Sequence, residues 1–136
     1  MSAPDQPPPP AGGRGVPAPL LVAASLAGLE AVLLVGYGIA LVPAIHADRL
    51  AMGLTTPLFF CIYGVALAWF AWRISRLQSW ARAPLVFAQL IQLGLASSFW
   101  GGSSTVAAVI IGVVAVLVLA GIFHPASLAA LADDET

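Results

Sequence analysis

Long apolar stretches alternate with short polar segments along most of this chain. Four apolar stretches run from Leu20 to Val42, Thr56 to Trp72, Pro84 to Trp100 and Thr105 to Phe123. Each holds about 17 to 23 residues, the length that an α-helix needs to cross a hydrocarbon core roughly 30 Å thick. The connections between them are short, which favours antiparallel neighbours. The pattern therefore predicts an all-α membrane protein, an up-down bundle of four transmembrane helices within residues 20–123.

Prolines and threonines mark the expected ends of these helices. Pro43 closes the first stretch. Pro57 and Pro84 are expected in the first turns of the second and third helices, where a missing N–H costs little. Thr55 or Thr56 is expected to cap the second helix. The first stretch is longer than the apolar core of a signal peptide, so we expect a retained membrane anchor.

Polar segments flank the four stretches at both ends of the chain. Residues 1–19 are rich in proline and glycine and present no apolar face, so they are expected to form a disordered tail. Residues 124–136 are expected to form a short acidic tail. Within it, Ser127 is expected to cap a short helix of sequence LAALA.

Composition supports lipid as the surrounding solvent. Of the 136 residues, 60% are hydrophobic and only 8% are charged. In a soluble domain about a quarter of all residues are charged, so this chain has too few charged residues to cover its surface in water. The net charge of −1 gives no basic footprint for nucleic acid. The single cysteine, Cys61, is expected to be a small buried hydrophobe.

The arginines predict the orientation in the membrane. Arg73, Arg76 and Arg82 lie between the second and third stretches, and Arg14 precedes the first. Only Arg49 lies between the first and second. The positive-inside rule then places both termini and the 73–82 connection in the cytoplasm, for a multi-pass protein of the cytoplasmic (inner) membrane. The tryptophans expected at the two interfaces are Trp69, Trp72 and Trp80 inside and Trp100 outside.

Three polar side chains are predicted near the middle of the bilayer. Glu30 lies ten residues above Leu20, or ~15 Å at the rise of an α-helix. Gln92 lies eight residues above Pro84, or ~12 Å by the same rise. Tyr63 lies at a similar height on the descending second helix. Because lipid offers no hydrogen bonds, each of these groups needs a partner inside the protein.

Helical spacing indicates which of these side chains face one another. Gln89 and Gln92 are i, i+3 neighbours on one face of the third helix. Glu30 shares a face of the first helix with Tyr37, two turns above it. We therefore expect Glu30 to bond Gln92 or Gln89 across the bundle. No arginine reaches that depth, so Glu30 is expected to be protonated and to donate one hydrogen bond to an amide carbonyl.

Two interpretations of Glu30 follow. In the structural one, the side chain joins helices to each other or to a partner subunit. In the functional one, it is a proton or ion relay. We favour the structural interpretation because a proton relay needs several groups that can exchange a proton. One acid with two amides and no buried cation does not supply them. Small residues also favour close helix packing, including Ala23, Ala27 and Ala31, with Gly36, Gly38, Gly112 and Gly121 as further contact points.

The segments TTPLFFCIYG (55–64), RLQSWARAPLVFAQLIQLGLASSFWGG (76–102) and HPASLAAL (124–131) carry a resemblance. They are similar to small four-helix integral membrane proteins encoded in actinobacteria, and the WARAP…QLIQLGLA…SF string is the most specific part. The resemblance covers most of the chain beyond the N-terminal tail. It implies a fold and a lineage, but no activity and no site residues.

Motifs for catalysis or for cofactor binding are missing from the sequence. His46 and Asp48 lie two residues apart, but two ligands do not make a metal site. We expect no enzyme, no cofactor and no metal. The first hypothesis is a non-catalytic accessory or interaction subunit, with the lipid bilayer and another membrane protein or a second copy as partners. The second is a small oligomeric transporter or proton-coupled channel that uses Glu30, and a membrane enzyme ranks a distant third.

Overall fold

The computed structural model describes residues 15–135. Over this range the protein is all-helical and contains no strand, as predicted. Its α-helices are α1 (Ala18–Leu41), α2 (Leu50–Ser75), α3 (Arg82–Ser98), α4 (Thr105–Phe123) and α5 (Pro125–Ala132). Three helical stretches are long and apolar enough to cross a membrane, namely Ala18–Ala44, Ala47–Ser75 and Thr105–Phe123.

The ends of α1 and α2 differ from the sequence prediction. Helix α1 begins at Ala18 rather than Leu20, with Pro19 in its first turn, where the fixed φ of proline suits a helix. Residues 1–14 of the predicted tail lie outside the described residues. Helix α2 begins at Leu50, so Pro57 is buried inside it and Thr55 does not cap it. The Thr55 hydroxyl instead donates to the carbonyl of Ala51, 2.8 Å away.

The loop before α2 packs on the helical turn that precedes Pro57. A Cβ atom at Gly53 would lie 2.7 Å from Cγ2 of Ile45, which places this loop side chain directly against the helix. The loop itself consists of two short 3-10 turns, Val42–Ala44 and Ala47–Arg49. Within a membrane protein, such packing against neighbours lets a helix continue through proline.

The acidic tail also differs from the prediction, since it is largely helical. Helix α5 begins at Pro125, and the Nδ1 atom of His124 caps it by accepting from the Ala126 N–H at 3.2 Å. Ser127 is not the cap. It is buried inside α5, and its hydroxyl donates to the carbonyl of Gly121 at 2.6 Å. This bond fixes the sharp corner between α4 and α5.

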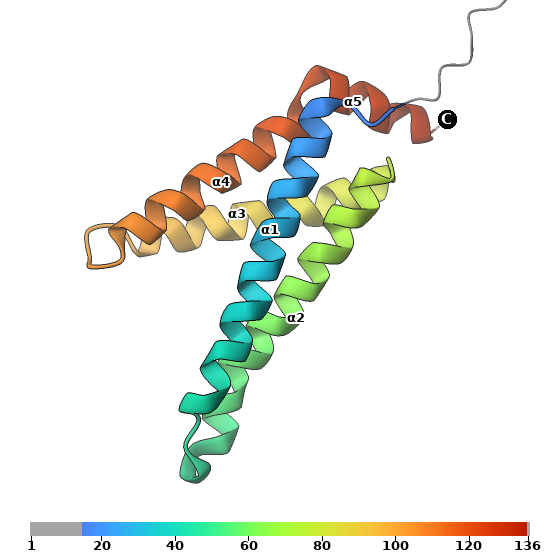
Figure 1. The fold of residues 1–136 in the computed structure, drawn as a ribbon. Coiled ribbons are helices and arrows are strands. Elements are labelled where there is room, and N and C mark those ends of the chain that lie inside the picture. Colours follow the sequence, from blue (N-terminus) through green and yellow to red (C-terminus); the bar gives the residue numbers. More distant parts are fainter. Residues whose placement is uncertain (1–14, 136) are drawn as a thin grey trace, which may run out of the picture.

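The four long helices form two hairpins that diverge from one end (Figure 1). Helices α1 and α2 make one hairpin, and α3 and α4 make the other (Figure 1). The start of α1, the connection between α2 and α3, and α5 gather at the end where the hairpins meet (Figure 1). The four helices therefore do not run side by side along their whole lengths, as the predicted up-down bundle requires. We call this arrangement the fork, and its two hairpins the arms.

Close helix contacts explain where the fork opens. A Cβ atom at Gly64 of α2 would lie 2.7 Å from Val35 and 2.9 Å from the carbonyl of Ala31, so only glycine allows this approach to α1. Gly121 of α4 likewise lies against the carbonyl of Pro19, at the start of α1. Helix α2 thus still packs on α1 at Ala31 and Val35, whereas Gly121 of α4 contacts the first turn of α1.

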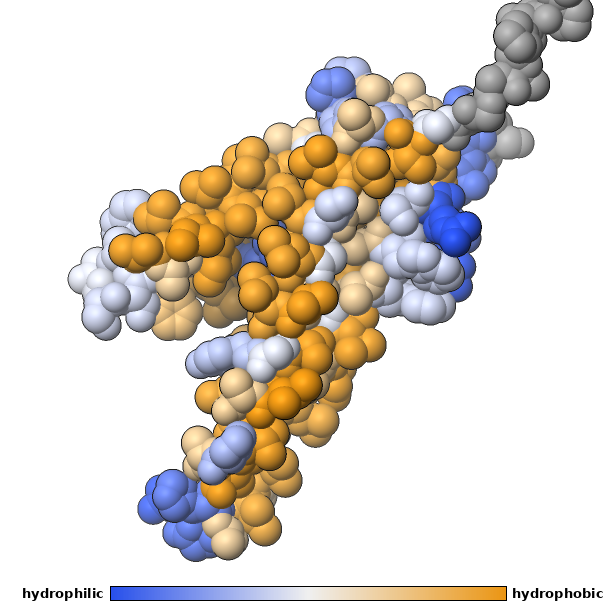
Figure 2. Space-filling view, in the orientation of Figure 1, coloured by the Kyte–Doolittle hydropathy of each residue, from blue (hydrophilic) through white to orange (hydrophobic). Residues whose placement is uncertain are grey.

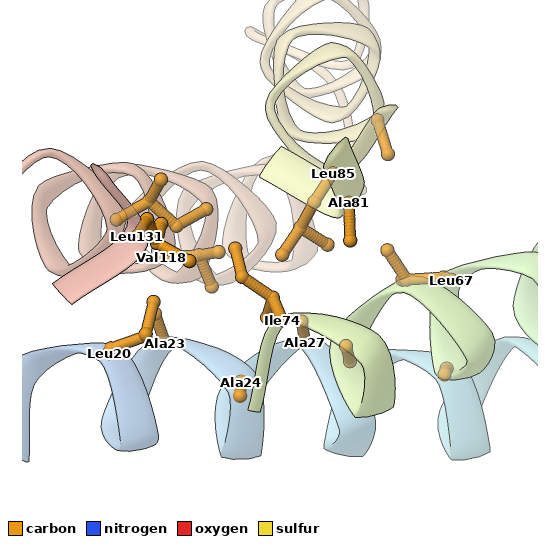
Figure 3. Packing of buried hydrophobic residues seen from close by; sticks show 14 residues of the cluster. Leu20, Ala23, Ala24, Ala27, Leu67, Ile74, Ala81, Leu85, Val118 and Leu131 are labelled. Atoms are coloured by element: carbon orange, nitrogen blue, oxygen red, sulfur yellow. The ribbon is translucent and has the colours of Figure 1, made fainter. Parts of the chain in front are cut away.

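The apolar core lies at the junction of the two hairpins. Figure 3 shows side chains of α1, α2, α4 and the start of α3 converging there. The largest fully buried apolar residues are Leu20, Leu67, Ile74, Leu85, Val118, Ile122 and Leu131. On the face seen in Figure 2, most of the surface of both arms is apolar, and polar residues gather mainly at the ends of the arms. This distribution is what a lipid environment requires.

Candidate functional site

A cluster of polar side chains joins α1 to α3 inside the protein. The amide nitrogens of Gln89 and Gln92 donate to the same carboxyl oxygen of Glu30, Oε2, at 2.8 and 3.1 Å. Gln89 is fully buried, and Glu30 and Gln92 are only 9% and 7% exposed. The i, i+3 spacing on α3 brings both amides to one carboxyl group. The predicted contact between these faces is therefore present, and it uses both glutamines.

Tyr63 of α2 adds a third helix to this cluster. Its hydroxyl donates to the carbonyl of Ala88 at 3.0 Å, one residue before Gln89. The hydrogen bonds of Glu30 and Tyr63 thus connect α1, α2 and α3 at one level. We call Glu30, Tyr63, Gln89 and Gln92 the carboxyl–amide cluster.

Tyr37, the remaining residue predicted to belong here, lies elsewhere. Its side chain is 54% exposed, and its ring packs edge to face on Phe60 at 5.2 Å. Helix α3 has already diverged from α1 along the later turns of α1 (Figure 1). No partner from α3 is therefore available to Tyr37.

The hydrogen bonds of Glu30 run in the opposite direction from the one expected. We expected the carboxyl group to donate to an amide oxygen, whereas the amides donate to it. Glu30 Oε1 and Gln89 Oε1 are buried and have no hydrogen-bond partner among residues 15–135. Both atoms belong to residues that already share the 2.8 Å bond. A proton on Glu30 Oε1 would convert one of these two acceptors into a donor.

Arginine and tryptophan side chains gather where α2 meets α3. The Arg73 guanidinium lies 4.3 Å from the ring centre of Trp69 and 5.2 Å from that of Trp72. The Arg76 guanidinium lies 5.5 Å from the Trp72 ring. Such stacking holds the cations close to the apolar part of the helix. Arg82 is the first residue of α3, and Trp100, 71% exposed, lies at the far end of the same hairpin.

Gln78 organises this connection, although sequence analysis did not identify it. Its Oε1 atom accepts from Arg73 Nη1 at 3.0 Å and from Trp80 Nε1 at 3.2 Å. Asp134 was missed as well, and its carboxylate accepts from the backbone N–H and the hydroxyl of Ser79 at 3.1 and 3.3 Å. Neither residue stands out in the sequence, because a loop glutamine or a tail aspartate is normally solvated. These contacts depend on how distant segments meet.

The surface of the described residues has two hollows, one far from the carboxyl–amide cluster and one that Tyr63 helps to line. One, of about 620 Å³, is an open groove beside the loop between α1 and α2, and His46, Asp48 and Arg49 contribute to its lining. The other, of about 240 Å³, lies between α2 and α3 and is lined almost wholly by apolar side chains. Among residues 15–135 there is no group of three or more side chains suited to holding a metal ion.

Comparison of the chain with known protein families, curated proteins and solved structures gives no match. The resemblance to actinobacterial four-helix proteins thus stays a prediction. The described residues place the chain in the class of all-helical proteins with three helical stretches long and apolar enough to span a membrane.

Proposed function

We propose that the protein is a four-span integral protein of the cytoplasmic membrane, with both termini in the cytoplasm. Helix α3 would be the fourth span. It has 17 residues and pairs with α4 as a hairpin (Figure 1). Its two glutamines donate hydrogen bonds to Glu30. Its remaining surface carries exposed Phe87, Leu90 and Leu95, which suit lipid. The described parts of the segments predicted to be cytoplasmic, residues 15–19, 73–82 and 124–135, lie at the end of the fork where the hairpins meet (Figure 1).

Thiol labelling tests this topology. Cys61→Ser provides a background without thiols, into which single cysteines are placed at Asp48, Ser79 or Ser103. A membrane-impermeant maleimide added to whole cells or spheroplasts is expected to label positions 48 and 103 and to spare 79. Labelling of 48 without 103 would show that α3 does not cross the membrane.

Within this membrane, we propose that the protein acts as a non-catalytic accessory or interaction subunit. The observation that carries the proposal is the fork, because each arm beyond the junction offers apolar faces that no other helix among residues 15–135 covers (Figures 1 and 2). Gly28, Gly36 and Gly94 support it, since an added Cβ at any of them would meet nothing within 4 Å. On a membrane helix, a glycine with no neighbouring atoms at its surface allows a partner helix to approach closely.

Affinity purification in mild detergent, with mass determination of the intact assembly, tests this role. We expect a second membrane protein in fixed stoichiometry. Gly36→Leu should reduce its recovery, whereas Ile39→Leu, a matched change at another exposed position of α1, should not. A purely monomeric or homo-oligomeric product would contradict the accessory role.

One observation favours a second candidate, a small oligomeric transporter or proton-coupled channel. Within the described part of the chain, Glu30 Oε1 and Gln89 Oε1 are buried acceptors without partners. An ionisable group such as Glu30 inside a membrane is by default a candidate ion or proton site. Proton flux into liposomes containing the wild-type protein or Glu30→Gln tests it. Flux that disappears in Glu30→Gln, with the assembly intact, would favour this candidate over the accessory subunit.

A further inference from the structure

Two oxygen atoms of the carboxyl–amide cluster are buried without a partner. Glu30 Oε2 accepts from Gln89 Nε2 at 2.8 Å, whereas Glu30 Oε1 and Gln89 Oε1 have no partner among residues 15–135. In each side chain, the unpartnered oxygen shares a carbon atom with the bonded atom. The existing bond therefore brings both oxygens into the same part of the cluster. Two buried acceptors in one place need a donor, because an unpaired buried acceptor costs free energy.

No neighbouring side chain of the described residues supplies this donor. On α1 and the helices packed around it, the other titratable or charged side chains are Tyr37 on α1, Cys61, Tyr63 and Arg73 on α2, and Arg82 on α3, with none on α4 or α5. Cys61 and Tyr63 donate to backbone carbonyls, and the Arg73 guanidinium donates to Gln78. Tyr37 is exposed on another level, and Arg82 begins α3 about two helical turns before Gln89.

The same surroundings disfavour an ionised Glu30. Its two hydrogen bonds come from neutral amides and reach only one oxygen, and none of the surrounding cations pairs with it in the described part of the chain. A buried charge without a counter-ion costs far more than a lost hydrogen bond. A proton on Oε1 removes both difficulties, because it neutralises the carboxyl group and makes this oxygen a donor.

We propose that Glu30 binds a proton on Oε1 and donates it to Gln89 Oε1. A carboxylic acid and a primary amide each carry a donor and an acceptor side by side, so the two groups close into a pair with two hydrogen bonds. One of them is the 2.8 Å bond already described. The closed pair is a proton-dependent lock between α1 and α3, and so between the two arms. Ionisation of Glu30 sets two acceptors against each other and leaves a charge that water must stabilise, so the arms separate at this level.

Infrared difference spectroscopy of the purified full-length protein tests the protonation. Exposed carboxyl groups are ionised at neutral pH, so we expect the C=O band of a protonated carboxylic acid from Glu30 alone. The band should be present in the wild type and lost in Glu30→Gln. Asp48→Asn, which removes an exposed carboxylate, should leave it unchanged. A wild-type spectrum without this band at neutral pH would overturn the proposal, because water or a cation would then have to bridge the two oxygens.

The two glutamines provide a matched pair of variants. Gln89 forms both bonds only with the protonated acid, whereas Gln92 donates to Oε2 in either state and more strongly to the charged one. Raising the pH should therefore remove the acid band at a lower pH in Gln89→Met than in the wild type, and at a higher pH in Gln92→Met. Shifts in the same direction would show that the proton is not shared with Gln89.

Distances between spin labels test the lock. In the Cys61→Ser background, labelled cysteines are placed at the exposed positions Leu33 of α1 and Leu95 of α3. In the wild type, the distance should lengthen over the pH range in which the acid band disappears. In Glu30→Gln it should stay constant, because the amide keeps both bonds without titrating. A distance that stays constant in the wild type while the band disappears would refute the lock. Because no partner protein is present, these results are independent of the accessory role.

Discussion

At the scale of single residues, Glu30 shows how a carboxyl group is accommodated in an apolar segment. Two glutamines on the next hairpin supply neutral donors to one of its oxygens. The depth of Glu30 and Gln92 and the i, i+3 spacing of the glutamines made this contact predictable. The binding of both amides to the same oxygen depends on the angle at which α3 passes α1, and the sequence does not contain that angle.

Truncating Glu30 should therefore weaken the junction of the two hairpins. In Glu30→Ala, both amides lose their acceptor, and we expect the free energy of unfolding to fall by about 1 kcal/mol, as for other hydrogen bonds between membrane helices. Glu30→Gln should lose less because its amide oxygen still accepts. Unfolding by denaturant in mixed micelles measures both values.

Leu29→Ala is the control for this pair, since the neighbouring Leu29 side chain is exposed. It should change the free energy of unfolding less than Glu30→Ala does. If Glu30→Ala unfolds like the wild type, the carboxyl–amide cluster does not hold the hairpins together.

At the scale of the helices, close approach at individual glycines decides which surfaces pair. Sequence analysis expected close helix contacts at four glycines, Gly36, Gly38, Gly112 and Gly121. Their surroundings in the structure differ. A Cβ atom would clash at Gly38 and at Gly121, make an ordinary contact at Gly112 and meet nothing at Gly36. Gly64 was not singled out, yet it lies against α1. A glycine reveals that close approach is allowed, but only the tertiary structure shows whether a neighbour uses it.

Alanine substitution separates used glycines from open ones. Gly64→Ala places a methyl group 2.9 Å from the backbone oxygen of Ala31, so we expect overpacking to cost about 1–3 kcal/mol. Gly121→Ala should behave similarly against the carbonyl of Pro19. Gly28→Ala and Gly94→Ala have open space and should be neutral or stabilising by up to ~1 kcal/mol.

Thermal unfolding in detergent measures all four alanine variants under one condition. A Gly64→Ala protein as stable as Gly94→Ala would contradict the tight contact between α1 and α2.

At the scale of the whole molecule, the fork separates the loops at the tips of the two arms. The 3-10 turn Ala47–Arg49 closes one arm and the Phe99–Ser104 segment closes the other. The arms point in different directions from the shared junction (Figure 1). An up-down bundle would instead place both turns side by side on one membrane surface.

Crosslinking distinguishes the two arrangements. In the Cys61→Ser background, cysteines at Asp48 and Ser103 should resist a short bifunctional thiol reagent within one chain. Cysteines at Ser79 and Asp134 are the positive control, because these residues are hydrogen-bonded in the structure. Electrophoresis of the monomer measures both reactions, and efficient crosslinking of the 48/103 pair would support a closed bundle.

The sequence by itself determined that the described chain is helical and that Glu30 faces the glutamines. It predicted four membrane-crossing stretches, and three helical stretches of the structure are long and apolar enough for this. These features follow from local composition and from helical periodicity, which neighbouring residues encode. The continuation of α2 through Pro57, next to the turn on which Ile45 packs, was not predicted by local rules for helix ends. The fork, the exposure of Tyr37 and the groove between α2 and α3 were decided only by the tertiary structure. The physical reason is that crossing geometry depends on contacts between residues far apart in the chain, such as Gly64 with Ala31 and Gly121 with Pro19.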